Sequence, residues 1–339
     1  MNGLSQLGSY VGRRILVAPL NWGLGHATRC VPIIQLLSAN NDLIIGSDGA
    51  ALAWLREEFP DMPYIELPSY GIRYGSQQMW INILRSSPRL IQAIHEESSM
   101  IGQVVGAYHI DLVISDHRLG LSTDLCESVV VAHQIHIPHR NNVLASMASV
   151  TNRNFLNRFD HVLIPDREEE NHRIAGKLSE SKGLVSSTYI GPLSRCSIVP
   201  TDLDVDVSFV LSGPEPSRQR FEDLCHKVIQ SLPASYSVAL VRGSSLPNKS
   251  SQGLSYCHDL MNSEEINHLL NRSKLVVSRS GYSTIMDLLV LKKKAILIPT
   301  PNQPEQEYLA ARLGEKGAYS TTTENKMVEE LPVLIKSLL

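Results

Sequence analysis

The sequence predicts an α/β protein made of two Rossmann-like domains, whose parallel sheets face each other across a cleft. Short apolar runs alternate with helical patterns along the 339 residues, which is typical of parallel α/β layers. Each half also has a Gly-containing turn between a strand pattern and a helix pattern, at residues 20–26 and 278–284. The length favours two cores over one.

A polar, proline-containing stretch at residues 190–202 separates the two halves and marks the domain boundary. We expect a first domain over residues 1–198 and a second over residues 199–323. A last helix over residues 324–339 could pack back on the first domain.

Apolar runs predict strands in both halves. In the first half they cover residues 14–20, 42–47, 64–67, 111–116, 128–133 and 161–165. In the second half they cover residues 205–211, 236–241, 274–278 and 295–299.

Helical spacing of apolar residues predicts helices between these strands. They cover residues 28–37, 88–107, 217–232, 263–271, 284–291 and 305–315. Ser87 and Pro88 have the residue types of an N-cap and a first helical position. Asn262 and Glu265 have the spacing of a capping box.

Composition excludes several classes of function. The net charge of −3 gives no electrostatic case for nucleic-acid binding. Five scattered cysteines form no CxxC pair, so neither a disulfide framework nor a structural zinc site is expected, and a reducing cytoplasm fits. No signal-peptide pattern and no membrane-spanning apolar run occur.

The first turn, with Gly23, Gly25 and His26, has residues that suit an anion at a helix N-terminus. The unperturbed pKa of a histidine, about 6.5, suits a general base that takes a proton from a hydroxyl. Asp116 ends a strand of the same half and could orient His26 or be the base itself. A plain strand-to-helix turn is the alternative. Thr28 stands where a dinucleotide fingerprint needs glycine, so a nicotinamide cofactor is not expected.

The second turn has the residues of a nucleotide-sugar site. Its N–H groups could face a diphosphate, and Asp287 could accept hydrogen bonds from a ribose diol. Gln306 and Glu307 open the next helix and could bind the sugar. The residues of the turn itself are Arg279, Ser280, Gly281, Tyr282, Ser283 and Thr284.

A further strand-to-helix turn, at residues 212–218, is a weaker candidate for phosphate binding. Arg218 and Arg220 could reach phosphate oxygens, although Glu215 argues against a phosphate on this loop. A proline-stiffened turn with solvent-facing arginines is the alternative.

Two other patterns have an ordinary explanation beside a functional one. His133, His136 and His139 are spaced by three, but Pro138 breaks any helix that would align them, so no metal is expected. An apolar run with flanking arginines could contact a membrane surface or a lipid-linked acceptor, although an ordinary buried helix explains it as well. Its residues are Met79, Trp80, Ile81, Ile83 and Leu84, with Arg73, Arg85 and Arg89.

Residues 275–313 resemble the C-terminal donor domain of MurG-like glycosyltransferases, the group that includes the plant galactolipid synthases. The resemblance rests on Arg279-Ser280-Gly281-Tyr282-Ser283-Thr284-Ile285-Met286-Asp287, on Ile298-Pro299 and on Gln306-Glu307. It extends to the first turn, where the family's Gly-rich loop ends in a histidine that falls on His26. It implies a GT-B fold, a UDP-linked sugar donor, and metal-independent, inverting transfer to a hydroxyl acceptor.

The resemblance also implies roles for single residues. Asp287 falls where the family binds ribose, and Gln306 and Glu307 fall where it binds the donor sugar. Ser212 and Gly213 fall near the diphosphate, and Met261 lies near the loop that frames the nucleobase. Asp287 replaces a Glu of the family and Glu307 replaces a Gln.

A second resemblance competes with the first. Gly23-x-Gly25-His26-x-x-Arg29-Cys30 is similar to the first loop of the UDP-sugar hydrolase of pseudaminic acid synthesis. That enzyme shares the fold and uses water as its acceptor. A hydrolase or epimerase, and a non-catalytic sugar-nucleotide-binding protein, therefore stay open as alternatives to a transferase.

Overall fold

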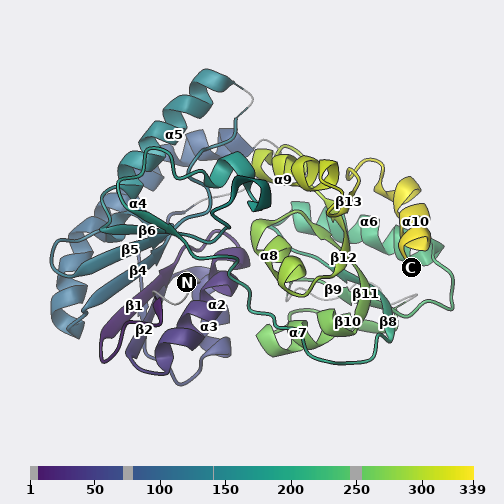
Figure 1. Ribbon diagram of the computed structural model, residues 1–339, viewed down its shortest axis with the longest axis horizontal. Helices are drawn as coiled ribbons and strands as arrows, with labels where there is room; N and C mark the ends of the chain where they lie inside the picture. The colour runs from purple at the N-terminus through teal and green to yellow at the C-terminus, as the bar shows by residue number, and fades with distance from the viewer. Residues whose placement is uncertain (1–6, 72–78, 140, 245–253) are drawn as a thin grey trace. The chain divides into compact units, whose positions relative to one another are not determined.

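A computed structural model describes residues 7–71, 79–139, 141–244 and 254–339, with side chains from residue 89 onward in the second range (Figure 1). The chain divides into two compact units, the first ending at Leu193 and the second running from Ser194 to Leu339. Each unit is an α/β layer structure with one sheet. The expected run from Met79 to Arg85, as well as Arg73, falls outside the described side chains.

The first unit has a seven-stranded sheet in the order β3-β2-β1-β4-β5-β6-β7, with every pair parallel. Its strands are β1 (Arg14–Pro19), β2 (Asp42–Ser47), β3 (Tyr64–Glu66), β4 (Leu112–Asp116), β5 (Glu127–Val131), β6 (His161–Ile164) and β7 (Ser187–Tyr189). Its helices of at least ten residues are α2 (Leu24–Ser38), α3 (Gly49–Glu58), α4 (Met79–Tyr108) and α5 (Asn142–Leu156).

Side chains on both faces of the sheet in the first unit are buried. Leu16 and Ala18 of β1 pack in a cluster with Ile101 and Val104 of α4. Ile15 and Val17 point to the opposite face and are buried as well. Because both faces are covered, β1 is a continuous apolar run, as expected for a central parallel strand.

The second unit has a six-stranded parallel sheet in the order β10-β9-β8-β11-β12-β13. Its strands are β8 (Val205–Val210), β9 (Val238–Val241), β10 (Tyr256–His258), β11 (Ser273–Arg279), β12 (Lys294–Ile298) and β13 (Ser320–Thr321). Its helices are α6 (Ser217–Ser231), α7 (Ser263–Arg272), α8 (Tyr282–Val290), α9 (Pro304–Glu315) and α10 (Met327–Leu338).

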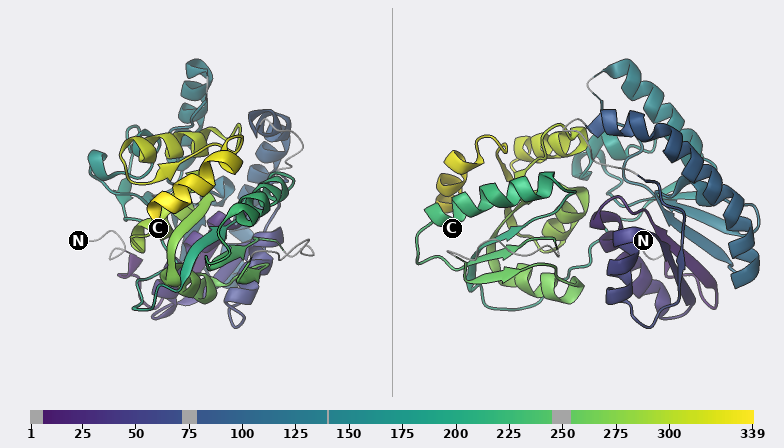
Figure 2. Two further views of the ribbon diagram at one scale, coloured as in Figure 1. Left: turned by 90° about the vertical axis from the view of Figure 1, so that its right-hand side faces the viewer. Right: turned by 180° about the vertical axis from the view of Figure 1, so that it is seen from behind.

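The last helix, α10, belongs to the core of the second unit. Met327, Leu331 and Ile335 are buried in one cluster with Phe221 and Val228 of α6. Figure 2 shows α10 and α6 side by side. The expectation that this helix packs on the first domain is therefore corrected, because its apolar stripe fills the space beside α6.

Other corrections concern elements that were not predicted or were predicted with other bounds. Helix α3 and the strands β7, β10 and β13 were not predicted; the three strands have only two or three residues each. Helix α4 begins at Met79, so Ser87 and Pro88 lie inside it and do not cap it. The capping box of Asn262 and Glu265 is confirmed, with both reciprocal hydrogen bonds at the start of α7.

Candidate active site

The order of the strands places one ligand-binding edge in each sheet. In the first unit the chain order reverses between β1 and β4, and in the second between β8 and β11. Ligands of open parallel sheets bind outside the carboxyl ends of the strands at such a reversal. The predicted residues at Gly23–His26 and Asp116 follow β1 and β4, and those at Ser212–Gly213 and Ser280–Gly281 follow β8 and β11.

The conformation of the turn from β1 into α2 is fixed by a backbone angle that favours glycine and by the hydrogen bonds of one side chain. Gly23 has φ 77°, a conformation that favours glycine, and it precedes the first helical residue. Asn21 donates from Nδ2 to Asp48 over 3.2 Å and accepts from the N–H of Ala51 over 3.2 Å. The side chain of Asn21 therefore ties the turn to the start of α3.

His26 and Asp116 meet at this edge, as the sequence suggested. Nδ1 of His26 lies 3.2 Å from Oδ2 of Asp116, and the His26 side chain is 14% exposed while Asp116 is fully buried. Arg29, one helical turn after His26, donates from Nε to Asp116 over 2.6 Å and also binds its other oxygen. Asp116 is therefore a buried carboxylate held by Arg29, and His26 is the more exposed member of the pair.

Two further histidines surround the pair. The rings of His117 and His26 meet edge to face with centroids 5.9 Å apart, and His133 lies 6.2 Å from His117. Nη1 of Arg29 is 2.9 Å from Nδ1 of His133. His117 has φ 61°, a conformation that is uncommon for any residue with a side chain and that gathers at functional sites.

Burial and charge set the protonation of this group. Burial lowers the pKa of His26 and the Arg29 cation lowers it further, while Asp116 opposes both. Burial, then Arg29 and His26, lower the pKa of His117 to about 3. Burial by itself would raise the pKa of Asp116, but Arg29 and His26 outweigh it and hold it below its usual range. The site therefore holds an anionic carboxylate and a guanidinium beside the neutral imidazoles of His26 and His117 at neutral pH.

Arg29, His117 and His133 belong to this group, although the sequence analysis gave none of them a role beside His26 and Asp116. Arg29 had a usable signal, because a residue three positions after His26 in a helix shares its face. His133 follows β5 and comes near His26 only through the strand order, which the spacing of three histidines obscured. Nδ1 of His136 faces Arg153 at 3.3 Å, and Nδ1 of His139 accepts from the N–H of Asn141.

A second buried network, also missed, supports the same edge. Arg118 donates from Nε to Glu97 over 2.6 Å and from Nη1 to Asp48 over 2.8 Å. Tyr70 donates to Glu97 over 2.6 Å. Because Asp48 also binds Asn21, these contacts link α4, β4 and the turn that carries His26.

In the second unit, the turn from β11 into α8 is short, and the space beside its last residue, at the N-terminus of the helix, is open. Gly281 is the residue before α8, and a Cβ there would meet nothing within 4 Å. The Ser280 hydroxyl donates to the carbonyl of Gln306 over 2.8 Å, so the turn is tied to α9. Tyr282 is buried, and Ser283 and Thr284 are partly exposed in the first turn of α8.

The structure corrects the expectation that arginines supply charge to a diphosphate. Arg218 is paired with Glu215 and with the buried Glu222. Arg279 is paired with Glu324, donates to the carbonyl of Pro299 over 3.2 Å and stacks on Phe221. Both guanidinium groups are about 2% exposed or less and are used inside the fold.

Asp287 is buried in the second turn of α8 and is already hydrogen-bonded. Its Oδ1 accepts from the Ser194 hydroxyl over 2.6 Å, and Nε of Arg195 lies 3.8 Å from Oδ2. Burial raises the pKa of Asp287, against Arg195 and Ser194. The carboxylate thus ties α8 to the segment that begins the second unit, a role that the sequence did not suggest.

Gln306 and Glu307 hold the loop between β12 and α9. Oε1 of Gln306 accepts from the N–H of Thr300 over 2.9 Å, and Oε1 of Glu307 accepts from the N–H of Asn302 over 2.9 Å. Asn302 has φ 61°, so the loop is shaped by these two side chains. Ser212 and Gly213 are exposed after β8, with φ 109° at Gly213, and Met261 is partly exposed just before α7.

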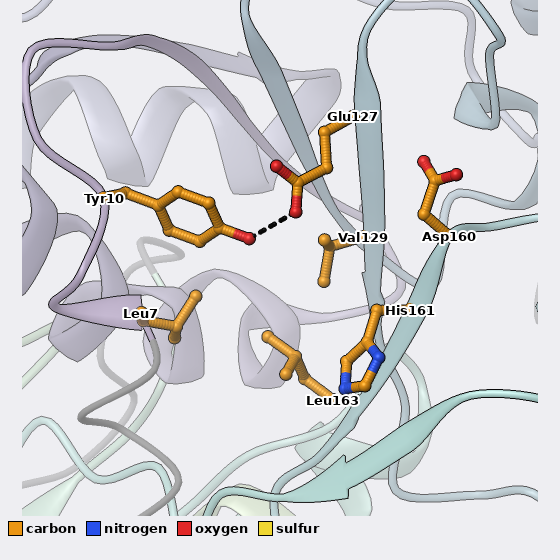
Figure 3. Close-up of a pocket in the computed structure, with 7 residues that line it drawn as sticks. All are labelled: Leu7, Tyr10, Glu127, Val129, Asp160, His161 and Leu163. Atoms are coloured by element: carbon orange, nitrogen blue, oxygen red, sulfur yellow. Dashed lines mark hydrogen bonds between the residues drawn. The ribbon is translucent and has the colours of Figure 1, made fainter.

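A cavity of about 180 Å³ in the first unit lies at the sheet edge opposite to the one that carries His26 and Asp116 (Figure 3). Glu127 and His161, which line it, are the first residues of β5 and β6. The hydroxyl of Tyr10 donates to Glu127 over 2.6 Å. The cavity therefore opens at the amino ends of the strands, away from Asp116 on β4.

Within the residues that the structure describes, no cluster of three or more His, Cys, Asp or Glu side chains has the geometry to hold a metal ion. No helix in the part of the chain described by the structure has the length and apolar character to cross a bilayer.

The C-terminal part of the chain matches a known glycosyltransferase domain. Residues 217–339 match the glycosyltransferase family 28 C-terminal domain. An uncharacterised glycosyltransferase of Methanopyrus kandleri is 22% identical over 315 residues, 87% of this chain and 85% of the relative. A UDP-N-acetylglucosamine--N-acetylmuramyl-(pentapeptide) pyrophosphoryl-undecaprenol N-acetylglucosamine transferase of Bacillus thuringiensis is 27% identical over 125 residues, 34% of this chain and 35% of the relative.

Solved structures confirm the fold class. The glycotransferase of kitacinnamycin superposes with a TM-score of 0.64 at 13% identity, over 97% of this chain and 91% of that one. Two Rossmann-like units with parallel sheets, a family 28 C-terminal domain and these relatives agree with one another. The chain has the GT-B fold, its residues 217–339 match a glycosyltransferase domain, and it is similar to MurG-like glycosyltransferases.

Proposed function

We propose that the protein transfers a sugar from a UDP-linked donor to a hydroxyl acceptor in one displacement, with inversion at the anomeric carbon and without a metal. The observation that carries the proposal is the pairing of His26 with the buried Asp116 at the ligand-binding edge of the first sheet. The similarity to a UDP-N-acetylglucosamine transferase supports an N-acetylhexosamine or a related hexose as the sugar.

In the proposed reaction His26 takes the proton of the acceptor hydroxyl. The oxygen attacks the anomeric carbon as the bond from that carbon to the β-phosphate oxygen breaks, and UDP leaves. Asp116 stabilises the imidazolium that forms, because its carboxylate lies 3.2 Å from Nδ1 of His26. General base catalysis of this kind contributes roughly 10²–10⁴-fold to the rate.

We assign the leaving diphosphate to the turn before α8. Arg218 and Arg279 are engaged in internal ion pairs, so backbone N–H groups and the dipole of α8 carry this role. Gly281, without a side chain, lets an anion approach the first turn of α8. Preorganised donors of this type are each worth about 3 kcal/mol of barrier.

The remaining donor contacts are proposed from the same edge of the second sheet. Asp287 binds the ribose through Oδ2, the oxygen that faces Arg195 and not Ser194, and Met261 lies beside the base. Gln306 and Glu307 act on the sugar through the loop that they shape, since their Oε1 atoms bind its backbone. Ser212 and Gly213 complete the phosphate side.

A lipid-linked acceptor is supported by helix α5. Val143, Leu144, Met147 and Val150 share one face of this helix and are 67%, 46%, 63% and 45% exposed. Among the residues of α5 only Ser149 and Leu156 are buried, and its amino-terminal part extends beyond the rest of the first unit in Figures 1 and 2. An exposed apolar stripe of this kind suits contact with a membrane surface.

The second candidate is a UDP-sugar hydrolase, favoured by one observation. Arg29 follows His26 by three residues, as in the hydrolase-like pattern of the first turn, and contacts it directly. The same base would then activate water. A sugar-nucleotide-binding protein without turnover is the third candidate.

The experiment that separates the candidates has two steps. A thermal-shift panel of UDP, UDP-N-acetylglucosamine, UDP-glucose, UDP-galactose and dTDP-glucose identifies the donor, because a ligand that binds only the folded state raises stability. UDP release is then measured with the selected donor, alone and with saccharide acceptors. Release that requires an acceptor supports a transferase, release into water supports a hydrolase, and binding without release supports the third candidate.

A further inference from the structure

Arg29 lies at the centre of a buried group of side chains whose role the proposed reaction leaves open. Its guanidinium is 2% exposed and comes from α2, one turn after His26. Nε donates to Oδ2 of Asp116 over 2.6 Å, and Nη2 donates to Oδ1. This two-pronged ion pair fixes the plane of the guanidinium, which a lysine could not do.

The same guanidinium faces two imidazole rings. Nη2 lies 2.7 Å from Nδ1 of His26, and Nη1 lies 2.9 Å from Nδ1 of His133. Arginine has N–H donors only and keeps its proton in proteins, so Nδ1 accepts in both contacts. A neutral imidazole whose Nδ1 accepts a hydrogen bond carries its hydrogen on Nε2.

Asp116 is a second partner for the same atom of His26. Its Oδ2 lies 3.2 Å from Nδ1, a contact that becomes a hydrogen bond only when Nδ1 carries a proton. In that form Nε2 is unprotonated and can take a proton from a substrate. Nδ1 of His26 thus has a donor and an acceptor within reach, and each selects a different tautomer.

We propose that Arg29 is a positioning residue that holds resting His26 with its hydrogen on Nε2, and that His26 becomes a base when Nδ1 changes partner from Arg29 to Asp116. The inference rests on the proposed function for its catalytic meaning. The tautomer change moves one hydrogen from Nε2 to Nδ1 through solvent and leaves the ring neutral. Nε2 then takes the proton of the acceptor hydroxyl, and Nδ1 donates to Asp116.

The charged and titratable groups around His26 come from three elements. Arg29 and Cys30 lie on α2, Asp116 ends β4 and His117 follows it, and His133 follows β5. Burial raises the pKa of the Cys30 thiol well above its usual range, so it adds no charge. Removal of Arg29 deletes a cation that lowers the pKa of His26 and leaves Asp116, which raises it.

The test is a ¹H–¹⁵N correlation spectrum of the imidazoles in the full chain labelled with ¹⁵N-histidine, with the His26 signals assigned from a His26→Asn variant. We expect an unprotonated Nδ1 and a protonated Nε2 for His26 in the wild type. We expect a protonated Nδ1 in Arg29→Met, because Asp116 is then the remaining partner. Arg167→Met, at an exposed arginine, is the matched control and should leave the His26 signals unchanged.

A wild-type spectrum with the proton on Nδ1 of His26 would overturn the inference, as would an Arg29→Met spectrum identical to the wild type. If Arg29→Met does not fold, the test rests on the His26 signals in the wild-type spectrum and in the spectrum of Arg29→Lys. The spectra do not depend on turnover, so they stand even if the protein has no transferase activity.

A pH profile adds the catalytic readout. The acidic limb of kcat/KM for UDP release should lie at higher pH in Arg29→Met than in the wild type, and Arg29→Lys, which keeps the cation, should return it toward the wild-type position. An acidic limb that does not move contradicts the assignment of Arg29 to His26.

Discussion

Nδ1 of His26 and Oδ2 of Asp116 lie 3.2 Å apart although 90 residues separate them in the chain. The strand order produces this contact, because β1 and β4 are neighbours in the sheet and α2 starts directly after β1. A polar pair with one buried and one accessible member, at the ligand-binding edge of a parallel sheet, is the arrangement that general base catalysis needs.

Replacement of His26 by alanine should remove turnover and leave nucleotide binding in place. We expect kcat for UDP release to fall roughly 10²–10⁴-fold, because the proton acceptor is lost, while the affinity for UDP by calorimetry stays within about twofold of the wild type. His95→Ala is the matched control, since His95 is exposed on α4. Unchanged turnover in His26→Ala would remove this residue from the mechanism.

Asp287→Asn should weaken UDP binding. The amide keeps the size of the side chain and an oxygen for the Ser194 hydroxyl, but it replaces the other oxygen by a donor that a ribose hydroxyl cannot donate to. We expect the Kd for UDP to rise about tenfold, which corresponds to about 1.4 kcal/mol. Asp223→Asn, at an exposed position of α6, serves as the control. Equal affinities for UDP in Asp287→Asn and wild type would reject the ribose role.

The stability of the protein should depend on the protonation of His117. Its pKa is lowered to about 3 by burial, Arg29 and His26, whereas an unfolded histidine titrates near 6.5. The neutral ring therefore contributes stability that is fully present above pH 6.5 and is lost as the pH falls toward 3. One such group adds up to about 1.4 kcal/mol per pH unit to the slope of the unfolding free energy.

His117→Asn tests this dependence, because asparagine tolerates the φ of 61° at this position. Urea unfolding between pH 4 and 6 should give a shallower rise of the unfolding free energy with pH in the variant than in the wild type. Parallel curves for the two proteins would show that His117 does not contribute to acid sensitivity.

Membrane binding through α5 should respond to a charge on its apolar stripe. Met147→Glu places a carboxylate on the face that carries Val143 and Val150, so binding to vesicles of anionic phospholipid should fall at least severalfold in a sedimentation assay. Ala148→Glu adds the same charge at an exposed position to the side of the stripe and should bind like the wild type. Equal binding by Met147→Glu and Ala148→Glu would exclude a role for the stripe.

Removal of the Glu222 carboxylate should destabilise the second unit strongly. Glu222 is buried and accepts hydrogen bonds from Arg218 and from Nε of Arg242, the latter over 2.6 Å. Glu222→Ala leaves two buried cations without this partner, which costs about 3–5 kcal/mol. The measurement is chemical unfolding, with Asp223→Ala as the exposed neighbour. A decrease in the unfolding free energy of less than about 1 kcal/mol would show that the ion pairs of Glu222 with Arg218 and Arg242 do not contribute strongly to the stability of this unit.

The strands and helices of both cores could be predicted because their apolar patterns are strong. The run at β1 is buried on both faces, and the capping box at Asn262 is a local signal. The edge strands β7, β10 and β13 were missed because two or three residues are too few for a recognisable alternation of apolar and polar side chains. Helix α3 buries Ala51, Leu52, Trp54 and Leu55 at helical spacing, a signal that the prediction overlooked.

The site could be predicted to the level of its edges but not of its contacts. Spacing placed His26 and Asp116 at the ends of strands, and the fold brings them together. The spacing did not reveal that Glu222 pairs with Arg218 and Glu324 with Arg279. The first pair forms within a helix that also faces the core, and the second forms between distant elements. Ion pairs in a buried layer depend on three-dimensional neighbours, which a single sequence does not give.

The most direct measurement of the central claim is UDP release from UDP-N-acetylglucosamine, or from the donor that the thermal-shift panel selects, with and without saccharide acceptors. We predict that the wild type releases one UDP for each glycoside formed and that its release of UDP without acceptor is at background. We predict that His26→Ala forms no glycoside and releases no UDP above background. UDP release at the same rate without any acceptor, or full transfer activity in His26→Ala, would contradict it.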